Sequence, residues 1–521
     1  MLRALGRSVE LSRPVDWRTL DALAPTRLWR FHLHYHEFFE DAAFTDSGID
    51  PGSVWEFIDA WICQFTGTPG KAVDDAWHPY VVSRRIPVWV KLFESAPPPE
   101  PIRRRVVTSL TAQFRWLADN LEWDVRGNHL VQNLRGLAVA AAFFRGPEAD
   151  HRLQQGGRYL RDQLPEQILP HGEHFERSPA YHIDMLAALA DIRSAGLAAE
   201  ATWANQLDEP IERMAHFLRR ILHPDGQIPL FGDSTLDQYP APKEVLAALG
   251  LEIPTEANRA ARSECVGDYW IFRCGADSMI FDAGPAGPDH LPAHAHADLL
   301  TFEASWQGKR LFVDGGVSDY GDTPARAFCR GTSAHNVLEI DGLNQCDVWS
   351  RFRMGRRGWP ERLRCGQDGP FHWARCAHNA YRFVGVPRVG RLMVCVGDGP
   401  WIILDWAEGR GKHRFVNRLR LGPDWSVARE DGALLTVTDG RESLAVRTLS
   451  GAEVRCQPTQ YYPFFGCSTP VIALEQEAET APPYVSGWII SRTSDEAPMA
   501  EVRGTSVLLH WRGYRTEIGL T

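Results

Sequence analysis

The sequence predicts an α+β protein of two domains, a helical domain over residues 1–258 and an antiparallel β-sandwich over residues 259–521. Three observations predict this fold class. Apolar residues recur every three or four positions between about residues 50 and 250, which is the period of an amphipathic helix. Short runs rich in β-branched and aromatic residues follow from about residue 260. No comparable helical pattern separates those runs, which favours antiparallel strands.

The helical half is expected to consist of long helices joined by short loops. Residues 1–28 form a lead-in with one helix, and Pro or Gly interrupts the later pattern at 97–99, 146–147, 170–172 and 224–226. Three segments step along one apolar face: Val107, Leu110, Phe114, Leu117 and Leu121; Leu130, Leu134, Leu137, Ala141 and Phe144; and Ile211, Met214, Leu218 and Ile221. Short connections between such helices favour antiparallel pairs.

The second half contains short runs that are expected to be strands, divided by Gly, Asp and Asn. They are Tyr269–Phe272, Met279–Asp282, Leu299–Trp306, Arg310–Asp314, Val337–Asp341, Leu392–Val396, Trp401–Trp406, Gly487–Ser491 and Ser506–Trp511. Many short strands without intervening helices are typical of a β-sandwich.

The composition is that of a globular protein, with 44% hydrophobic and 23% charged residues among 521. The formal net charge of −10 and the absence of a long basic run argue against nucleic acid as a partner. An acidic substrate is compatible with this charge, because a cleft can be locally basic. No stretch reaches the roughly 18 apolar residues of a transmembrane helix. Nothing in the sequence indicates the oligomeric state.

The N-terminus has no apolar segment typical of a secretory signal, so a cytoplasmic protein is expected, or a periplasmic one if a leader is missing from this chain. Nine of the ten cysteines follow residue 264, and none forms a C-x-x-C pair. We therefore expect mostly buried thiols in a reducing compartment.

The stretch 292–300 carries the strongest chemical signal. His294, His296 and Asp298 alternate, and an apolar run follows them. Alternate residues of a strand share one face, so these three side chains are expected to project together. Such a set suits a base, a metal ligand and an orienting carboxylate. The alternative is a polar strand end with solvated histidines.

Three other groups are rich in chemically active residues. Arg126-Gly127-Asn128-His129 opens a helix, where the alternative role of Asn128 is a cap. The segment 172–182 places seven polar or titratable residues before another helix. Asp314 and His335 end or begin predicted strands and could join His296 in a site with three N or O ligands, which suits zinc.

Weaker candidates lie in the helical half. His32, His34 and His36 stand among aromatic residues, and we expect a half-buried segment whose polar edge touches a cleft; a metal cluster is the alternative. Eight tryptophans lie in residues 17–123, and either core packing or stacking on the rings of a ligand explains such residues. Arg126, Arg177 and Arg330 are candidates for gripping sulfate or carboxylate, against a structural alternative.

Together these motifs resemble the heparinase II/III family of polysaccharide lyases. The similarity lies at 127–129, at 176–182, at Gly232-Asp233-Ser234, at His294-x-His296-x-Asp298, and at 314–316 with His335-Asn336. The resemblance implies an incomplete (α/α) toroid followed by a β-sandwich, with the active cleft between them. It also implies β-elimination at a uronic acid residue of an acidic polysaccharide or oligosaccharide.

The resemblance assigns catalytic roles to Asn128, Tyr181 and His294. Elimination requires that the uronate carboxylate be neutralised, because the C5 proton is otherwise weakly acidic. Asn128 matches the neutralising position of the family. Tyr181 matches the acid that protonates the leaving oxygen, and His294 matches the base or its partner. The geometry of elimination decides which of the two is the base.

The resemblance and the local sequence also assign supporting residues. His129, Glu176, His182, Arg330 and His36 are expected to contact substrate. His296, Asp314 and His335 match metal-ligand positions of the family, where an ion orders the β-domain, and Asp298 is expected to orient a ligand ring. Thr301 stands where the family often has Ser. A structural divalent metal, expected to be zinc, follows from these matches.

Two other functions remain open from the sequence. A glycoside hydrolase on the same scaffold would use two carboxylates roughly 6.5–9.5 Å apart, and Glu173, Glu176 and Asp233 are available for this. A glycan-binding protein without activity is the second alternative. The substrate, endo or exo action and the identity of the metal are not fixed by these motifs.

Overall fold

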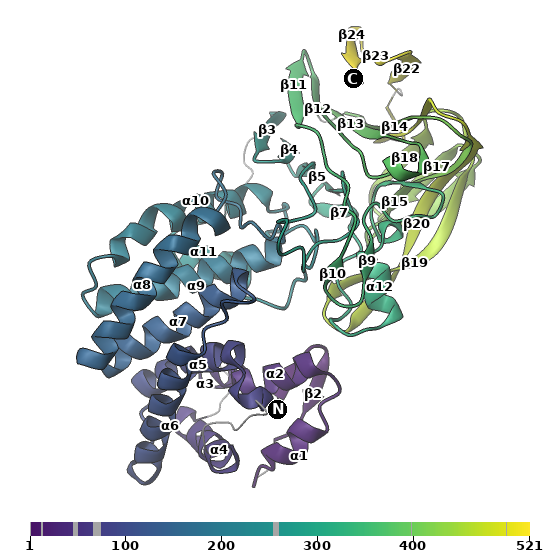
Figure 1. The fold of residues 1–521 in the computed structure, drawn as a ribbon. Coiled ribbons are helices and arrows are strands. Elements are labelled where there is room, and N and C mark those ends of the chain that lie inside the picture. Colours follow the sequence, from purple (N-terminus) through teal and green to yellow (C-terminus); the bar gives the residue numbers. More distant parts are fainter. Residues whose placement is uncertain are drawn as a thin grey trace. The chain divides into compact units, whose positions relative to one another are not determined.

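The computed structural model describes residues 2–11, 14–44, 50–65, 74–253, 260–397, 399–495 and 498–520. The chain divides into two compact units, one of Met1–His174 with Ile183–Ala215 and the other of Phe175–His182 with His216–Thr521. Figure 1 shows helices in the purple to blue part of the chain and most strands in the green to yellow part. This arrangement confirms the predicted α+β class. The domain boundary at residue 258 stays a prediction.

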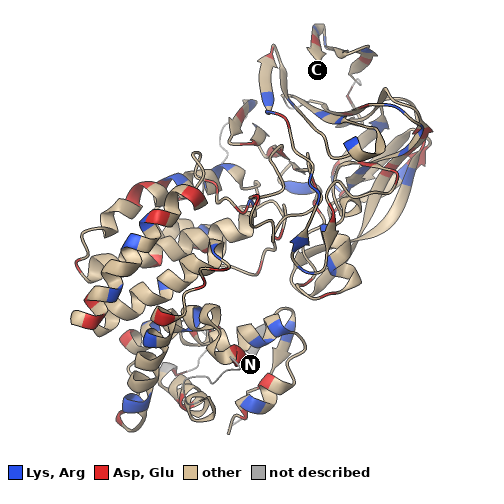
Figure 2. Ribbon diagram, viewed as in Figure 1, with Lys and Arg blue, Asp and Glu red and all other residues tan. Residues whose placement is uncertain are grey.

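The first unit is helical apart from one short hairpin. Its elements are β1 (Leu2–Ala4), β2 (Arg7–Val9), α1 (Trp17–Ala22), α2 (Arg27–Tyr35), α3 (Phe38–Phe44), α4 (Pro51–Gln64), α5 (Pro79–Ser95), α6 (Glu100–Asp119), α7 (Gly127–Phe144) and α8 (Pro147–Gln167). Helices α9 (Pro179–Ala198) and α10 (Asp208–Ile221) have residues in both units. Short 3-10 turns form η1 (Asp75–Trp77) and η2 (Ala204–Leu207). Acidic and basic residues are interspersed along the helices (Figure 2). Closure of the helices into a toroid stays a prediction.

Helix α5 is the most buried of these helices, and α7 packs against it. Gly136 of α7 makes the close approach possible, because a Cβ there would lie 2.8 Å from the Cα of Ser83 in α5. Aromatic residues fill the core around them, and Trp55, Trp61 and Trp89 are fully buried. Most of the tryptophans before residue 100 are therefore core residues, as the packing alternative predicted.

The second unit contains antiparallel sheets. Its strands are β3 (Arg262–Val266), β4 (Tyr269–Cys274), β5 (Asp277–Asp282), β6 (Phe302–Trp306), β7 (Lys309–Phe312), β8 (Leu338–Ile340), β9 (Val348–Trp349), β10 (Arg353–Met354), β11 (Arg364–Asp368), β12 (Phe371–His378), β13 (Arg388–Val396), β14 (Trp401–Glu408), β15 (His413–Arg420), β16 (Ser426–Asp431), β17 (Leu434–Thr438), β18 (Ser443–Thr448), β19 (Val454–Phe464), β20 (Cys467–Thr480), β21 (Tyr484–Arg492), β22 (Met499–Arg503), β23 (Ser506–Trp511) and β24 (Tyr514–Gly519). Helices α11 (Pro242–Ala248) and α12 (Pro324–Arg330) and the turns η3 (Thr332–Ala334) and η4 (Arg382–Val384) lie between them.

Three larger sheets organise this unit. Their strand orders are β3-β4-β5-β6-β7, β11-β12-β13-β14-β21-β18-β17-β16 and β19-β20-β15-β8. One apolar cluster joins residues of all three, among them Trp306, Trp401 and Leu474. The shared cluster shows that the sheets bury their apolar faces together, which is the packing that alternating strands require.

One expectation about local structure is wrong. Residues 291–301 form a loop, and β6 begins only at Phe302, so His294, His296 and Asp298 do not share a strand face. Leu300 has a φ of 67°, which no regular strand accommodates.

The cysteines are mostly free thiols, as expected. Eight of the ten are free and five of those eight are buried, whereas Cys265 and Cys365 form a disulfide that was not expected. The reducing compartment stays a prediction.

Across the described residues, no helix combines the length and the apolar character needed to cross a membrane.

Candidate active site

Tyr181 and His294 stack face to face in the second unit. Tyr181 lies in the first turn of α9, His294 lies in the loop before β6, and the ring centroids are 3.8 Å apart. The Tyr181 hydroxyl is 3.2 Å from the hydroxyl of Tyr320. Tyr181 is 5% exposed and His294 is 8% exposed. A phenol and an imidazole are thus held side by side, each with a small accessible surface.

A buried carboxylate holds His294 in place. Asp233 Oδ2 lies 2.9 Å from His294 Nδ1, and Oδ1 lies 2.9 Å from His296 Nε2. Arg326 donates to both oxygens of Asp233. Burial is the largest influence on the pKa of Asp233 and opposes ionisation. The Arg326 charge and the histidine hydrogen bonds outweigh it, so the pKa lies well below the usual 3.8.

The backbone around Asp233 fixes this geometry. The Asp233 N–H donates to the carbonyl of His294 at 2.9 Å, and Ser178 Oγ donates to the carbonyl of Asp233 at 2.7 Å. Gly232 precedes it with a φ of 54°. A Cβ at Gly232 would lie 2.8 Å from the carbonyl oxygen of His294. Only glycine combines this backbone conformation with this close approach.

Of the predicted substrate contacts in this unit, Glu176 lies next to His294. Its Oε2 is 3.3 Å from His294 Nε2. His182 is 1% exposed, and its ring lies 5.0 Å from that of Phe217. The structure therefore gives His182 a packing role in place of the predicted contact with substrate.

Arg330 has a structural role as well. Its guanidinium is 1% exposed and donates to the carbonyl oxygens of Ala295, Ser350 and Arg353. These bonds hold the loop that carries His294, so the expected grip on a substrate anion is wrong for this conformation. Arg177 is likewise paired with Asp268 and Asp282.

Asn128 and His129 lie in the first unit, at the start of α7. The N-cap position is Arg126, so the capping alternative for Asn128 is wrong. His129 Nδ1 lies 2.9 Å from Glu122 Oε1, and its ring lies 4.3 Å from that of Tyr80. Asn133 donates to the other oxygen of Glu122 at 2.9 Å. His129 is thereby oriented on one side and partly exposed on the other.

His36 is a core residue of the same unit. It is fully buried, its Nδ1 accepts a hydrogen bond from Trp89 Nε1 at 2.9 Å, and burial lowers its pKa well below 6.5. The expectation that it contacts substrate is therefore wrong. His34 is also fully buried and lies 3.0 Å from Asp21 and from Trp61.

His296, Asp298 and His335 form a group that can hold a metal ion, with one ligand atom of each within 4.8 Å of the others. His296 Nε2 faces Asp233, and His335 Nδ1 faces Asp314 at 2.9 Å. Their other nitrogens, Nδ1 and Nε2, are buried without hydrogen-bond partners among the described residues. Each ring thus has a carboxylate on one side and a lone pair on the other, which is the pattern of metal-ligating histidines.

This group differs from the expected ligand set by one residue. Asp298 takes the ligand position, and burial raises its pKa to about 6. Asp314 accepts hydrogen bonds from His335 and from Thr301 Oγ1 at 2.9 Å. Asp314 therefore orients His335. The sequence had suggested Asp314 as the metal ligand and Asp298 as the orienting carboxylate.

Sequence reasoning missed Tyr320 and Arg326, and it assigned Asp233 only to a hydrolase. Tyr320 and Arg326 stand outside every motif, so the sequence carries no signal for either. Asp233 lies in a Gly-Asp-Ser motif that marked its importance but not its role. Because Arg326 and two histidines occupy both of its oxygens, Asp233 is poorly suited to act as a hydrolytic acid or base.

These features define a two-domain α+β protein with a tyrosine and histidine pair next to a candidate metal group. The Heparinase II/III N-terminus family matches residues 8–249, and the Heparinase II/III-like, C-terminal family matches residues 258–493. The chain belongs to the heparinase II/III-like family.

Relatives of known function and solved structures agree with this assignment. A heparin-sulfate lyase of Pedobacter heparinus is 26% identical over 54% of this chain and 46% of its own length. One of Bacteroides thetaiotaomicron is 25% identical over 60% of this chain and 51% of its own length. The chain thus spans about half the length of these curated relatives. A crystal structure of heparinase III has a TM-score of 0.76 at 18% identity, over 98% of this chain and 86% of that one.

Proposed function

We propose that this protein is a polysaccharide lyase that cleaves a uronic-acid-containing glycosaminoglycan by β-elimination. The stacked Tyr181 and His294, with Asp233 behind the imidazole, carry the proposal. The relatives named heparin-sulfate lyases favour a substrate of the heparan sulfate type.

Elimination begins with the carboxylate next to C5. The Asn128 amide donates to this carboxylate and stabilises the enolate-like state that forms as the C5 proton leaves. His129 assists from the same helix turn, because Glu122 fixes its ring. The residues contribute hydrogen bonds to a charge that develops only in the transition state, which is where such bonds accelerate a reaction.

Proton transfer falls to Tyr181 and His294. The C5–H bond breaks, its electrons form the C4=C5 double bond, and the C4–O bond breaks toward the leaving sugar. One of the two side chains takes the C5 proton and the other protonates the leaving oxygen. The ionised Asp233 accepts the Nδ1–H of His294 and leaves Nε2 as the atom that exchanges protons. Asp233 is thus a positioning residue.

A zinc ion is proposed for the group of His296, Asp298 and His335. Two imidazoles and one carboxylate with a free position suit zinc. The ion would supply positive charge and a rigid crosslink between two segments of the second unit, the loop of His296 and Asp298 and the segment of His335. Since Asp233 binds both His296 and His294, order at the metal group is passed on to the catalytic imidazole.

The test is ultraviolet absorbance during incubation with heparan sulfate, heparin, chondroitin sulfate, hyaluronan and alginate. An unsaturated uronide absorbs, so we expect a rise with at least one sulfated substrate. New reducing ends without a rise in absorbance would show that the protein is a hydrolase and not a lyase. No reaction with any substrate, together with measurable binding, would indicate a glycan-binding protein.

A further inference from the structure

The hairpin of β9 and β10 exposes two aromatic side chains next to the stacked rings of Tyr181 and His294. Phe352 lies at its tip and is 37% exposed, and Trp349 at the end of β9 is 53% exposed. The centroid of the Phe352 ring lies 5.9 Å from that of His294 and 5.2 Å from that of Tyr320. Neither the sequence motifs nor the proposed elimination uses Phe352.

Two buried arginines of α12 fix the tip of this hairpin. Arg326 and Arg330 are each 1% exposed. Between them they donate to four backbone carbonyls of the tip at 2.9–3.4 Å, Arg326 to that of Arg351 and Arg330 to those of Trp349, Ser350 and Arg353. Because a buried guanidinium is costly unless its donors are satisfied, this network holds the tip in one position.

The same network joins the tip to His294. Arg326 also donates to Asp233, which in turn contacts the His294 imidazole. Arg330 also donates to the carbonyl of Ala295, the residue after His294. Phe352 is therefore fixed relative to the imidazole and yet keeps an accessible face. An exposed aromatic patch at a fixed place beside polar groups is typical of a ligand contact.

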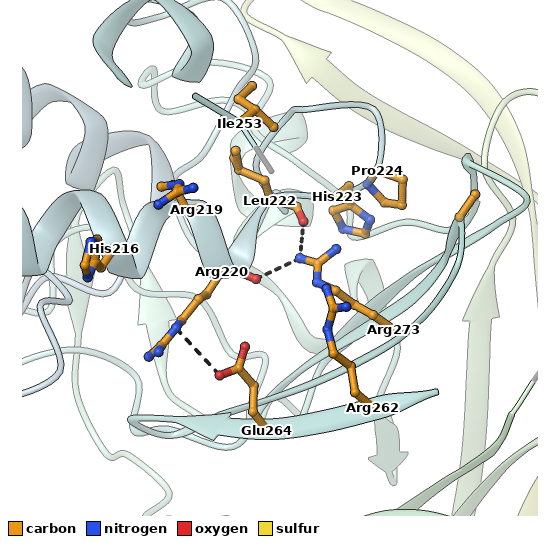
Figure 3. Close-up of a pocket in the computed structure, with 11 residues that line it drawn as sticks. His216, Arg219, Arg220, Leu222, His223, Pro224, Ile253, Arg262, Glu264 and Arg273 are labelled. Atoms are coloured by element: carbon orange, nitrogen blue, oxygen red, sulfur yellow. Dashed lines mark hydrogen bonds and ion pairs between the residues drawn. The ribbon is translucent and has the colours of Figure 1, made fainter. Parts of the chain in front are cut away.

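A cavity of about 420 Å³ at the end of α10 differs from this arrangement, because its polar lining is bonded within the protein (Figure 3). Arg273 donates to the carbonyls of Arg220 and Leu222, and Glu264 lies 3.6 Å from Arg220. These contacts join the end of α10 to β3 and β4. The hairpin tip uses its backbone for such contacts, and residues 349–353 all leave their side chains exposed.

The tip is also basic. Arg351 and Arg353 flank Phe352, and no acidic side chain of the described residues forms an ion pair with either. Their charge attracts an acidic chain within a Debye length, about 8 Å at physiological salt. A sugar that bears a carboxylate or sulfate matches this tip, because its C–H groups pack on an aromatic face and guanidinium groups bind its anion.

We propose that Phe352 is a substrate-binding residue, on which a sugar ring of the acidic glycan packs beside Tyr181 and His294. The choice of an acidic glycan rests on the proposed function. The ring contacts the bound sugar before and during the reaction. Its removal therefore raises KM more than it lowers kcat.

The test measures binding of a fluorescent heparan sulfate tetrasaccharide by anisotropy, in the full chain with Tyr181→Phe to suppress turnover. In this background we expect Phe352→Ala to bind about tenfold more weakly, since an aromatic contact is lost. Tyr514→Ala is the control, because Tyr514 is 55% exposed on β24 of a different sheet, and it should bind as the background protein does. Unchanged affinity of Phe352→Ala, or no binding by the background protein, would overturn the proposal.

Two further substitutions separate contact with the sugar from packing against His294. Phe352→Tyr keeps the flat ring and should keep the affinity, whereas Phe352→Leu keeps only apolar volume and should lose most of it. If the leucine variant binds as tightly as the tyrosine variant, the ring is no platform for a sugar. If Phe352→Ala lowers kcat without raising KM, the ring only positions His294. Should the alanine variant fail to fold, the leucine and tyrosine variants decide the question.

The charge of the occupant is tested with Arg351→Gln/Arg353→Gln. Glutamine keeps a polar side chain and removes both charges, so we expect several-fold weaker binding at low salt and a smaller difference at high salt. Unchanged affinity at low salt would overturn the choice of an acidic sugar.

Binding separates this proposal from the proposed function. If the protein forms no unsaturated product but Phe352→Ala still weakens binding, the sugar contact stands and the lyase assignment fails. If the protein catalyses elimination while every Phe352 variant keeps the wild-type affinity and KM, the lyase assignment stands and the sugar contact fails.

Discussion

At the scale of single residues, Asp233 contacts both the proposed catalytic imidazole of His294 and the buried guanidinium of Arg326. Asp233→Asn keeps the shape of the side chain but leaves Arg326, which is 1% exposed, as a buried cation without its carboxylate. Removing one partner of a buried ion pair costs about 3–5 kcal/mol. We expect a lower Tm and, because His294 loses its orienting acceptor, lower kcat per folded molecule.

The matched control for this variant is Asp405→Asn. Asp405 forms an equally buried pair with Arg391 at 2.8 Å. Its side-chain partners Arg391 and Asn417 are not candidate site residues, and Arg391 reaches the site only through the backbone carbonyls of Leu300 and Asn336. Asp405→Asn should lower the Tm of the protein and leave kcat per folded molecule unchanged. If Asp233→Asn keeps wild-type kcat as well, Asp233 does not position His294.

Tyr181→Phe removes one hydroxyl from the stacked pair. Since general acid–base catalysis contributes about 10²–10⁴-fold, we expect a fall in kcat of that order with little change in Tm. The control is Tyr381→Phe, which removes a buried hydroxyl that donates to the Leu343 carbonyl at 3.0 Å. Steady-state kinetics and thermal melts measure both. Near-normal turnover of Tyr181→Phe would show that the Tyr181 hydroxyl takes no part in proton transfer.

His335→Gln tests the metal group. His335 presents a buried Nε2 with no hydrogen-bond partner in the described chain, so its loss should lower bound zinc and the Tm. His378→Gln is the control, because His378 is equally buried but lies outside the group. Elemental analysis of purified protein gives the zinc content. Equal metal content in both variants would dismiss the site.

At the scale of elements, the loop around His294 explains what the sequence concealed. The alternation of His294, His296 and Asp298 favoured a strand, yet these residues lie in a loop. His296 Nε2 and His294 Nδ1 meet the same carboxylate from another loop. Contacts with Asp233, Arg326 and Arg330 override the local pattern, and a single sequence carries no signal for such tertiary contacts.

Gly232→Ala tests whether the Asp233 loop sets this geometry. A Cβ at residue 232 would press on the His294 carbonyl at 2.8 Å, so we expect lower kcat and a lower Tm. Gly250→Ala is the control, since Gly250 also has a positive φ but open space around it. The free energy of unfolding of Gly250→Ala should fall only by the about 1–2 kcal/mol that the left-handed backbone conformation costs an alanine. Equal kcat values for Gly232→Ala and Gly250→Ala would contradict the claim that the Asp233 loop positions His294.

At the scale of the whole molecule, the fold was more predictable than the site. Each of the nine predicted runs overlaps a strand, since those runs are apolar and buried. Strands rich in charge, such as β11 and β16, escaped prediction because most of their residues are exposed and show no apolar alternation. Asn128, Tyr181 and His294 could be named from motifs, whereas the burial of His36 and Arg330 depends on distant packing.

Acid should destabilise the whole protein through buried histidines. Burial lowers the pKa of His378 to about 3, and it also lowers that of His34. The unfolded chain binds these protons below about pH 6.5, whereas the folded chain keeps the two histidines neutral. The free energy of unfolding is therefore unaffected by them above that pH and falls as the pH is lowered toward 3. Each such histidine contributes a slope of up to about 1.4 kcal/mol per pH unit. Urea unfolding across this range gives the free energy of unfolding as a function of pH. Its slope should be shallower for His378→Gln than for the wild type, and an unchanged slope would show that protonation of His378 does not destabilise the fold.

The most direct test of the central claim is mass spectrometry of products formed in water labelled with heavy oxygen. Elimination takes no oxygen from solvent, so each cleavage should yield an unsaturated fragment one water lighter than a hydrolysis product, without the label. Tyr181→Phe should suppress this fragment. New reducing ends with no unsaturated fragment, each cleavage adding one water to the summed mass of the products, would show hydrolysis and contradict the roles given to Tyr181 and His294.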